Sequence, residues 1–188
     1  VLDDGVREGR KGFGNILKYI KMTASSNFGN MFSMIGASAL LPFLPMLPVQ
    51  ILLNNLLYDF SQTAVASDEV DPEYLAKPRQ WDLKGISRFM FCIGPISSIF
   101  DYATFAVMWF VFKANSPAYA NLFQTGWFVE SLLSQTLIVH VIRTGRLPFL
   151  ESRAGLPLAI TGIVICRTGP FLPLLPLAAN FGFVAHAG

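Results

Sequence analysis

Asp59 is a carboxylate in the middle of a long apolar stretch, residues 46–66. That stretch has about the length of a bilayer crossing, and a charge at its centre costs at least ~2.5–3.5 kcal/mol on insertion scales. In a helix Asn55, Asp59 and Gln62 lie one above another, because residues three and four apart share a face. The acid therefore comes with a column of amide oxygens, which is what a cation site inside a membrane needs.

A second polar face lies upstream, where Asn27 and Asn30 share one helical face. Asn30 and Asp59 are each about fourteen residues from the intervening proline turn, or roughly 21 Å along each helix, so we expect them at similar depth. Hard cations such as Mg²⁺ bind carboxylate and amide oxygens, and Mg²⁺ keeps several of its waters. Because no His or Cys lies nearby, zinc and copper fit poorly. The predicted metal ligands are Asn27, Asn30, Asn55 and Asp59, with Gln62 as a weaker candidate.

Two other acids lie in apolar surroundings and need an explanation under the same cost. For Asp101 we favour a structural role, in which the carboxylate bonds neighbouring Ser and Tyr hydroxyls. Glu130 is a weaker candidate for the ion site or for a proton acceptor. No catalytic residue and no cofactor site is predicted, since Gly12-Phe13-Gly14 lacks the third glycine and the strand of a phosphate-binding loop.

The composition indicates an integral membrane protein. Hydrophobic residues make up 53% of the 188, charged residues only 14%, and the mean hydropathy is +0.48, whereas soluble domains carry roughly 25% charged residues. The expected partner is the lipid bilayer, not nucleic acid. We predict an all-α, polytopic helix bundle of about five transmembrane helices plus a partial sixth, at about 22–44, 46–66, 89–112, 122–142 and 155–175.

The domain organisation follows from these spans. Residues 1–21 form a charged cytoplasmic segment and residues 22–188 a membrane domain. Its cytoplasmic loop, 67–88, is charged, and we expect a solvated surface there. Most Lys and Arg residues fall on the side of the amino end, which the positive-inside rule makes cytoplasmic. Small residues at Gly29, Ser33 and Gly36 allow another helix to approach closely. Because the chain begins at Val1, we expect it to be a piece of a longer protein.

Four stretches carry a family resemblance: KYIKMTASSNFGN (18–30), LNNLLYD (53–59), GPISSIFD (94–101) and SQTLIVHVIRT (134–144). They resemble the carboxy-terminal membrane region of bacterial magnesium-transporting P-type ATPases. The resemblance implies that the five spans match helices five to nine of ten, and that residues 1–21 are the cytoplasmic stalk segment that leads into helix five. It also implies that Asn27, Asn30, Asn55 and Asp59 are ion ligands. Helix four, which contributes to the family's ion site, is not part of this sequence. In the related calcium pumps the position of Asn30 is acidic, so this chain offers less negative charge.

The implied function is that of a membrane-domain fragment of an ATP-driven pump that imports Mg²⁺ across the bacterial inner membrane. The implied partners are helices one to four and the phosphorylation, nucleotide and actuator domains. ATP would be used only through those missing domains, so the fragment should not hydrolyse ATP alone. Two alternatives remain: a structural or regulatory membrane module without its own ion site, and an ion-coupled secondary transporter. The latter typically shows internal repeats, which the sequence lacks.

Overall fold

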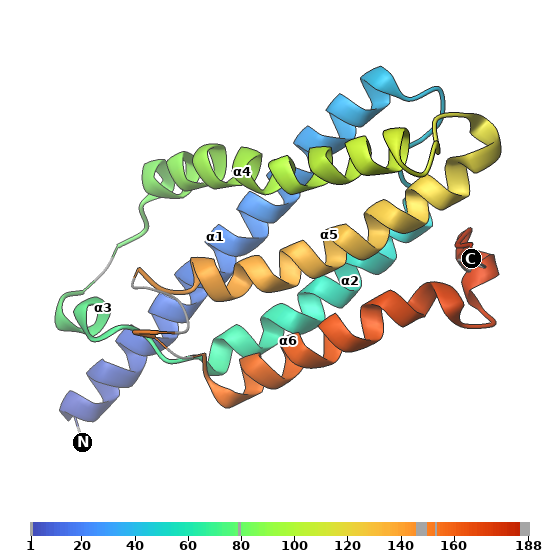
Figure 1. Cartoon of the computed structure of the whole chain (residues 1–188). Coiled ribbons are helices and arrows are strands. Elements are labelled where there is room, and N and C mark those ends of the chain that lie inside the picture. The colour runs from blue at the N-terminus through green and yellow to red at the C-terminus, as the bar shows by residue number, and fades with distance from the viewer. Residues whose placement is uncertain (1, 79, 146–149, 153, 185–188) are drawn as a thin grey trace.

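The computed structural model describes residues 2–78, 80–145, 150–152 and 154–184, and this part is helical without a strand. Its α-helices are α1 (Leu2–Leu40), α2 (Pro48–Thr63), α3 (Pro72–Ala76), α4 (Leu83–Phe110), α5 (Ala120–Ile142) and α6 (Leu156–Thr168). Short 3-10 helices are η1 (Ala64–Ser67), η2 (Pro117–Tyr119), η3 (Gly169–Leu174) and η4 (Ala178–Phe181). In Figure 1, α5 lies between α4 on one side and α2 and α6 on the other. The all-α prediction is confirmed.

Each of the five predicted spans overlaps a helix, although the first, 22–44, covers only the second half of α1, which begins at Leu2. The stretch 46–66 is α2 followed by η1, and the stretch 155–175 is α6 followed by η3. Two segments, Leu83–Phe110 and Leu156–Leu174, are long and apolar enough to cross a membrane by length and composition. In the described residues after 175 the only helix is the short η4, so the structure gives five long helices and no distinct sixth.

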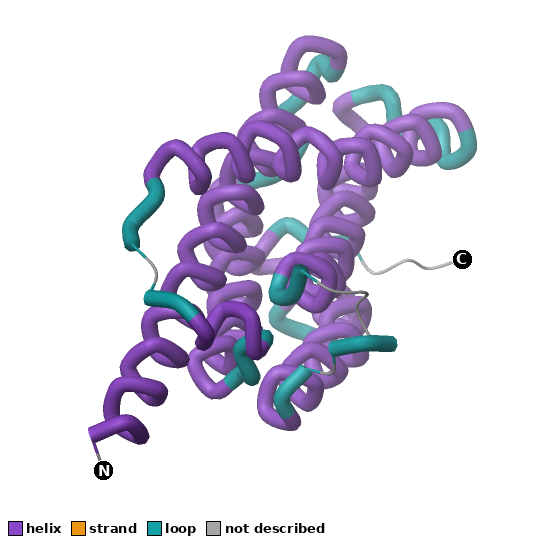
Figure 2. The backbone as a smooth tube through the Cα atoms, turned by 90° about the vertical axis from the view of Figure 1, so that its left-hand side faces the viewer, coloured by secondary structure: helices purple, strands orange, loops and turns teal. Residues whose placement is uncertain are grey.

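The predicted stalk and first span form one helix. α1 has 39 residues, or roughly 58 Å at 1.5 Å per residue, and its amino-terminal part extends beyond the other long helices (Figures 1 and 2). It ends at Leu40, just before Pro42. Pro48 occupies the first turn of α2, where its missing N–H is not needed. The proline turn therefore reverses the chain direction between α1 and α2.

α1 and α4 pack closely through small residues. A Cβ atom on Gly29 would lie 2.5 Å from the Ser97 Oγ and 3.0 Å from the Gly94 carbonyl oxygen, so only glycine fits there. Ser98 Oγ donates a hydrogen bond to the Gly29 carbonyl oxygen at 3.0 Å. This confirms the predicted close approach of a neighbouring helix at Gly29.

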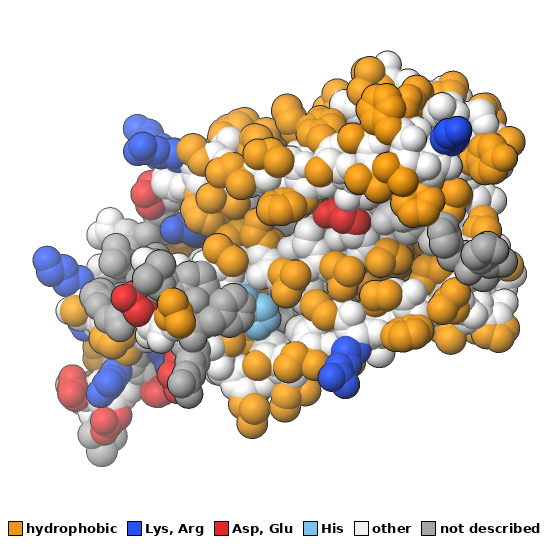
Figure 3. All heavy atoms as spheres, viewed as in Figure 1, with side chains coloured by type: hydrophobic (Ala, Val, Ile, Leu, Met, Phe, Trp, Pro, Cys, Tyr) orange, Lys and Arg blue, Asp and Glu red, His pale blue; other side chains and the backbone are white. Residues whose placement is uncertain are grey.

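The molecular surface separates apolar from charged residues. Figure 3 shows apolar side chains over most of α4, α5 and α6, with charged side chains gathered toward the amino-terminal end. Large side chains such as Ile99 of α4 and Ile163 of α6 are 62% and 58% exposed. Soluble monomers rarely expose such extensive apolar surface, whereas lipid covers it in a membrane. Arg79, Arg146 and Arg153 of the predicted basic side lie outside the described residues.

The expectation of a solvated surface over 67–88 is wrong for Asp68. Its carboxylate is 0% exposed and pairs with Lys18 Nζ at 3.0 Å and with Arg143 Nη1 at 3.3 Å. The Gly155 N–H donates to Asp68 Oδ1 at 2.9 Å. Two cations and a backbone amide offset the cost of burying this charge. Asp68 thus joins α1, the loop after η1, the end of α5 and the start of α6.

Candidate cation site

Three of the predicted ligands line one groove. Asn27 and Asn30 of α1 and Asn55 of α2 border a hollow of about 580 Å³ between the two helices. Asn27 is exposed, whereas Asn30 and Asn55 are partly buried. Trp127 and Ser131 of α5 also line the hollow. Amide side chains from two antiparallel helices therefore border one space in an otherwise mostly apolar lining, and amide oxygens are ligands that hard cations accept.

The three residues of the predicted polar column on α2 lie in three different environments. Asn55 borders the groove, Asp59 is exposed, and Gln62 is 1% exposed. Asp59 is not among the residues that border the groove. Gln62 Oε1 accepts a hydrogen bond from Thr23 Oγ1 at 2.8 Å, so this amide links α2 to α1. The structure therefore brings Asn27, Asn30 and Asn55 together and leaves Asp59 on an outward surface of α2.

The two remaining acids meet on the other side of α5. Asp101 Oδ2 accepts a hydrogen bond from Ser33 Oγ at 2.6 Å, and its Oδ1 accepts one from Trp127 Nε1 at 2.7 Å. Glu130 lies close enough to Asp101 for the two carboxyl groups to interact electrostatically, and its Oε2 atom is buried without a hydrogen-bond partner among the described residues. In Figure 3, acidic atoms are visible between α4 and α5 within an otherwise apolar area. Asp101 has the expected structural role, although a Trp indole takes the place of the Tyr hydroxyl, and Glu130 does not border the groove.

A hydrogen-bond network that sequence reasoning missed underlies the groove. Gln135 Nε2 donates to Asn30 Oδ1 at 3.0 Å and to Ser131 Oγ at 2.6 Å, and Asn54 Nδ2 donates to Ser131 Oγ at 3.1 Å. Ser26 Oγ donates to Gln135 Oε1 at 3.1 Å. Side chains of α5 thus connect both groove helices. The i, i+4 spacing of Ser131 and Gln135 was the available signal, because it places two polar groups on one face.

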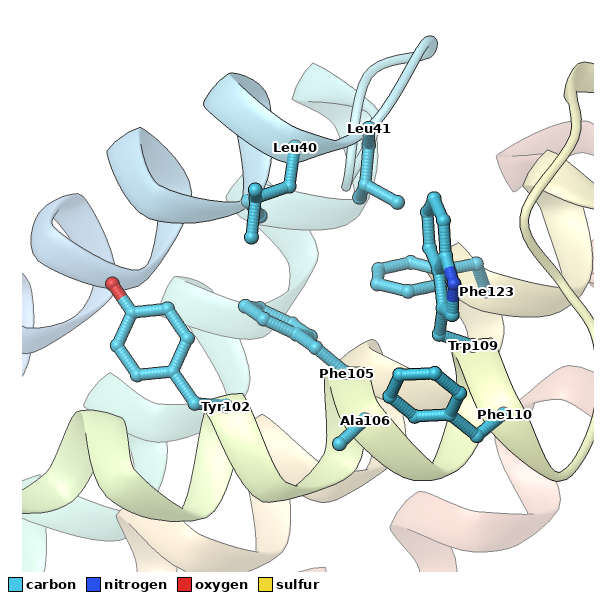
Figure 4. A pocket seen from close by; sticks show the side chains of 9 residues that line it. Leu40, Leu41, Tyr102, Phe105, Ala106, Trp109, Phe110 and Phe123 are labelled. Atoms are coloured by element: carbon cyan, nitrogen blue, oxygen red, sulfur yellow. The ribbon is translucent and has the colours of Figure 1, made fainter.

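A second hollow in the membrane region has a different character. Its volume is about 350 Å³, and it lies between the end of α1, α4 and α5. Figure 4 shows the rings of Tyr102, Phe105, Phe110 and Phe123 around it. The Tyr102 hydroxyl donates to the Phe32 carbonyl oxygen at 3.2 Å. This apolar lining offers no set of cation ligands.

Carboxylates do not cluster into a metal centre in the described part of the chain. No group of three or more His, Cys, Asp or Glu side chains there could hold an ion. The groove between α1 and α2 therefore offers neutral oxygens, and Asp59 is the nearest acid along α2. Neutral oxygens hold a cation weakly, so such a site suits an ion that keeps part of its hydration shell.

Comparison with known proteins places the chain beside transport ATPases. Residues 43–185 match the family described as "Cation transporting ATPase, C-terminus". The "Magnesium-transporting ATPase, P-type 1" of Salmonella typhimurium strain LT2 is 56% identical over 182 residues, which are 97% of this chain and 20% of that protein. The protein of the same name from Escherichia coli strain K12 is 59% identical over 179 residues, 95% of this chain and 20% of its own length. The chain thus spans about a fifth of these relatives.

Proposed function

We propose, from the premise that this chain belongs to the carboxy-terminal family of cation-transporting ATPases, that it is the membrane part of an ATP-driven Mg²⁺ pump. In this proposal the groove between α1 and α2 supplies part of the intramembrane ion site. The observation that carries it is the convergence of Asn27, Asn30 and Asn55 on one groove within a largely apolar helix bundle. The names of the relatives in Salmonella and Escherichia coli supply the ion and the energy source.

Asp59 completes the site from the outer side of α2. Its carboxylate is exposed in this chain, and an exposed acid in the middle of a membrane helix is costly unless a partner or a cation faces it. We assign that face to a helix of the rest of the pump. Mg²⁺ would then lie between Asp59, the groove amides and ligands from outside this chain. One carboxylate with several amides suits a partly hydrated Mg²⁺ ion.

The topology belongs to the same proposal. α1, α2, α4, α5 and the α6–η3 segment cross the bacterial inner membrane, with the amino end in the cytoplasm. Residues 1–21 act as the stalk and residues 22–188 as the membrane domain. Exposed apolar side chains on α4 and α6 support contact with lipid. Phosphorylation, nucleotide and actuator domains, together with the first four helices, come from the remainder of the pump.

Coupling to ATP requires two states of the site with different Mg²⁺ affinity. α1 runs without a break from the charged amino-terminal segment to the groove, because it is one helix from Leu2 to Leu40. Movement of its cytoplasmic end is therefore transmitted to Asn27 and Asn30. ATP hydrolysis occurs in the other domains, and this chain alters the geometry of the ion site.

Replacement of Asp59 by Asn in the full-length pump tests the proposal. We expect Mg²⁺ binding, measured by isothermal titration calorimetry without nucleotide, to weaken about tenfold or more, because the site loses its carboxylate. Asp3→Asn, at an exposed acid near the amino end of α1, is the control and should leave Mg²⁺ affinity unchanged. If Asp59→Asn alters only thermal stability, the chain is a structural or regulatory module and the proposal fails.

A further inference from the structure

Asn54 lies deeper in the groove than any of the predicted ligands. It borders the hollow, yet its exposed fraction is only 3%. Asn55, the next residue, is partly exposed, because consecutive helical side chains point roughly 100° apart. Asn54 therefore faces the inner wall that α5 provides, while Asn55 lies nearer the opening.

The two ends of the Asn54 amide have different surroundings. Nδ2 donates to Ser131 Oγ at 3.1 Å, and Gln135 Nε2 donates to the same oxygen at 2.6 Å. Oδ1 is buried and accepts no hydrogen bond from the described residues. Buried carbonyl oxygens in native proteins are almost always satisfied by protein, water or an ion. Asn54 Oδ1 is thus a buried, unsatisfied oxygen on a residue that lines the groove, next to the amides of Asn30 and Asn55 in an otherwise mostly apolar wall.

We propose that Asn54 is a further ligand of the transported cation. Its Oδ1 binds the hydrated Mg²⁺ ion, directly or through one of the ion's waters, while Ser131 holds Nδ2. This inference rests on the proposed function, since it adds a ligand to the same groove. It also makes α5 a third helix of the site, with Ser131 and Gln135 as positioning residues that do not touch the ion.

The network explains how the ligand oxygens keep their positions. Gln135 donates to Asn30 Oδ1 and to Ser131 Oγ, and an amide oxygen has two lone pairs. Asn30 can therefore bind a cation while it remains bonded to Gln135. Asn30 and Asn54, on opposite helices, are fixed by the same pair of α5 side chains. A change in the distance between α1 and α2 would separate these two oxygens and lower the affinity for the ion.

The test measures Mg²⁺ binding to the full-length pump by calorimetry without nucleotide. Asn54→Leu removes the oxygen, and we expect the Kd for Mg²⁺ to rise about tenfold or more. Asn121→Leu changes an exposed Asn at the start of α5 and should leave the Kd unchanged. If the Kd of Asn54→Leu equals that of the wild type, a water satisfies Oδ1 and the inference is wrong.

A second variant covers the case in which Asn54→Leu fails to fold. Asn54→Asp keeps the shape, can accept a hydrogen bond from Ser131, and adds negative charge at the position of Oδ1. We expect Mg²⁺ to raise its Tm more than it raises the wild-type Tm, since a ligand that binds the folded state stabilises it. An equal or smaller shift would overturn the inference. Asp59→Asn distinguishes the two proposals. If Asp59→Asn weakens Mg²⁺ binding and the Asn54 variants do not, the inference about Asn54 is wrong and the proposed function stands.

Discussion

At the scale of single residues, buried polar groups in this bundle divide into those that are satisfied and those that are not. The Asp101 carboxylate is satisfied, because each of its oxygens accepts a hydrogen bond, one from Ser33 and one from Trp127. Asn54 Oδ1 and Gln62 Nε2 are buried without a partner among the described residues. This contrast separates a carboxylate that holds helices together from an amide that is available to a ligand.

The contrast predicts different outcomes for two substitutions of Asp101. Asp101→Asn keeps an acceptor for Trp127 Nε1 and a donor for Ser33 Oγ, so the full-length pump should retain its Mg²⁺ affinity and nearly its Tm. Asp101→Leu leaves both groups without a partner, and we expect a loss of about 1–3 kcal/mol in stability for each. Thermal unfolding in detergent measures the difference. Loss of Mg²⁺ binding by a well-folded Asp101→Asn variant would instead assign Asp101 to the ion site.

At the scale of elements, the crossing of α1 and α4 depends on Gly29. Gly29→Leu places a side chain where even a Cβ meets Ser97 and the Gly94 backbone. Overpacking typically costs about 1–3 kcal/mol, so we expect a lower Tm and disturbed packing of Asn30, the adjacent groove residue. Gly9→Leu is the matched control, because a Cβ on Gly9 has nothing within 4 Å. Equal Tm values for the two variants would show that α1 and α4 separate without cost.

Helices and their order could be predicted from local sequence, whereas the contacts that individual polar residues make could not. Apolar length and the prolines at 42, 45 and 48 locate the end of α1 and both ends of α2 to within a few residues, since both signals act locally. They miss the start of α1, which lies at Leu2 and not near residue 22. Helical spacing grouped Gln62 with Asp59 on one face. The structure instead joins Gln62 to Thr23, because the position of a second helix decides which side of α2 is buried.

In the candidate site, too, local sequence identifies polar residues but does not show which other helix they contact. Asn27, Asn30 and Asn55 could be found because each is a polar residue in an apolar segment. Asn54 lies in the same segment but gains its surroundings from Ser131, which is 77 positions away. Adjacent asparagines give no sequence signal as to which one faces the inner wall. Only the packing of α5 against α2 distinguishes them.

At the scale of the whole molecule, Asp68 ties together four segments at the end of the bundle that we propose to be cytoplasmic. Lys18 lies on the stalk side of α1, Arg143 at the end of α5, and Gly155 just before α6, and all three bind the Asp68 carboxylate. Asn15 Nδ2 also donates to the Asp68 carbonyl oxygen at 2.9 Å. A displacement of α1 would therefore reach α5 and α6 through this residue as well as through the membrane region.

Neutralising Asp68 should both destabilise the bundle and loosen that connection. Asp68→Asn leaves Lys18 and Arg143 buried without a counter-charge, and breaking a buried pair in this way costs about 3–5 kcal/mol. We expect a markedly lower Tm for the full-length pump and faster proteolytic cleavage in the 67–88 loop. In variants that still fold, ATP hydrolysis should depend less on Mg²⁺ binding, because the stalk is no longer held to α5. Glu69→Gln alters the neighbouring exposed acid and should match the wild type. A wild-type Tm and wild-type coupling in Asp68→Asn would show that the ion pairs do not connect the stalk to the ion site.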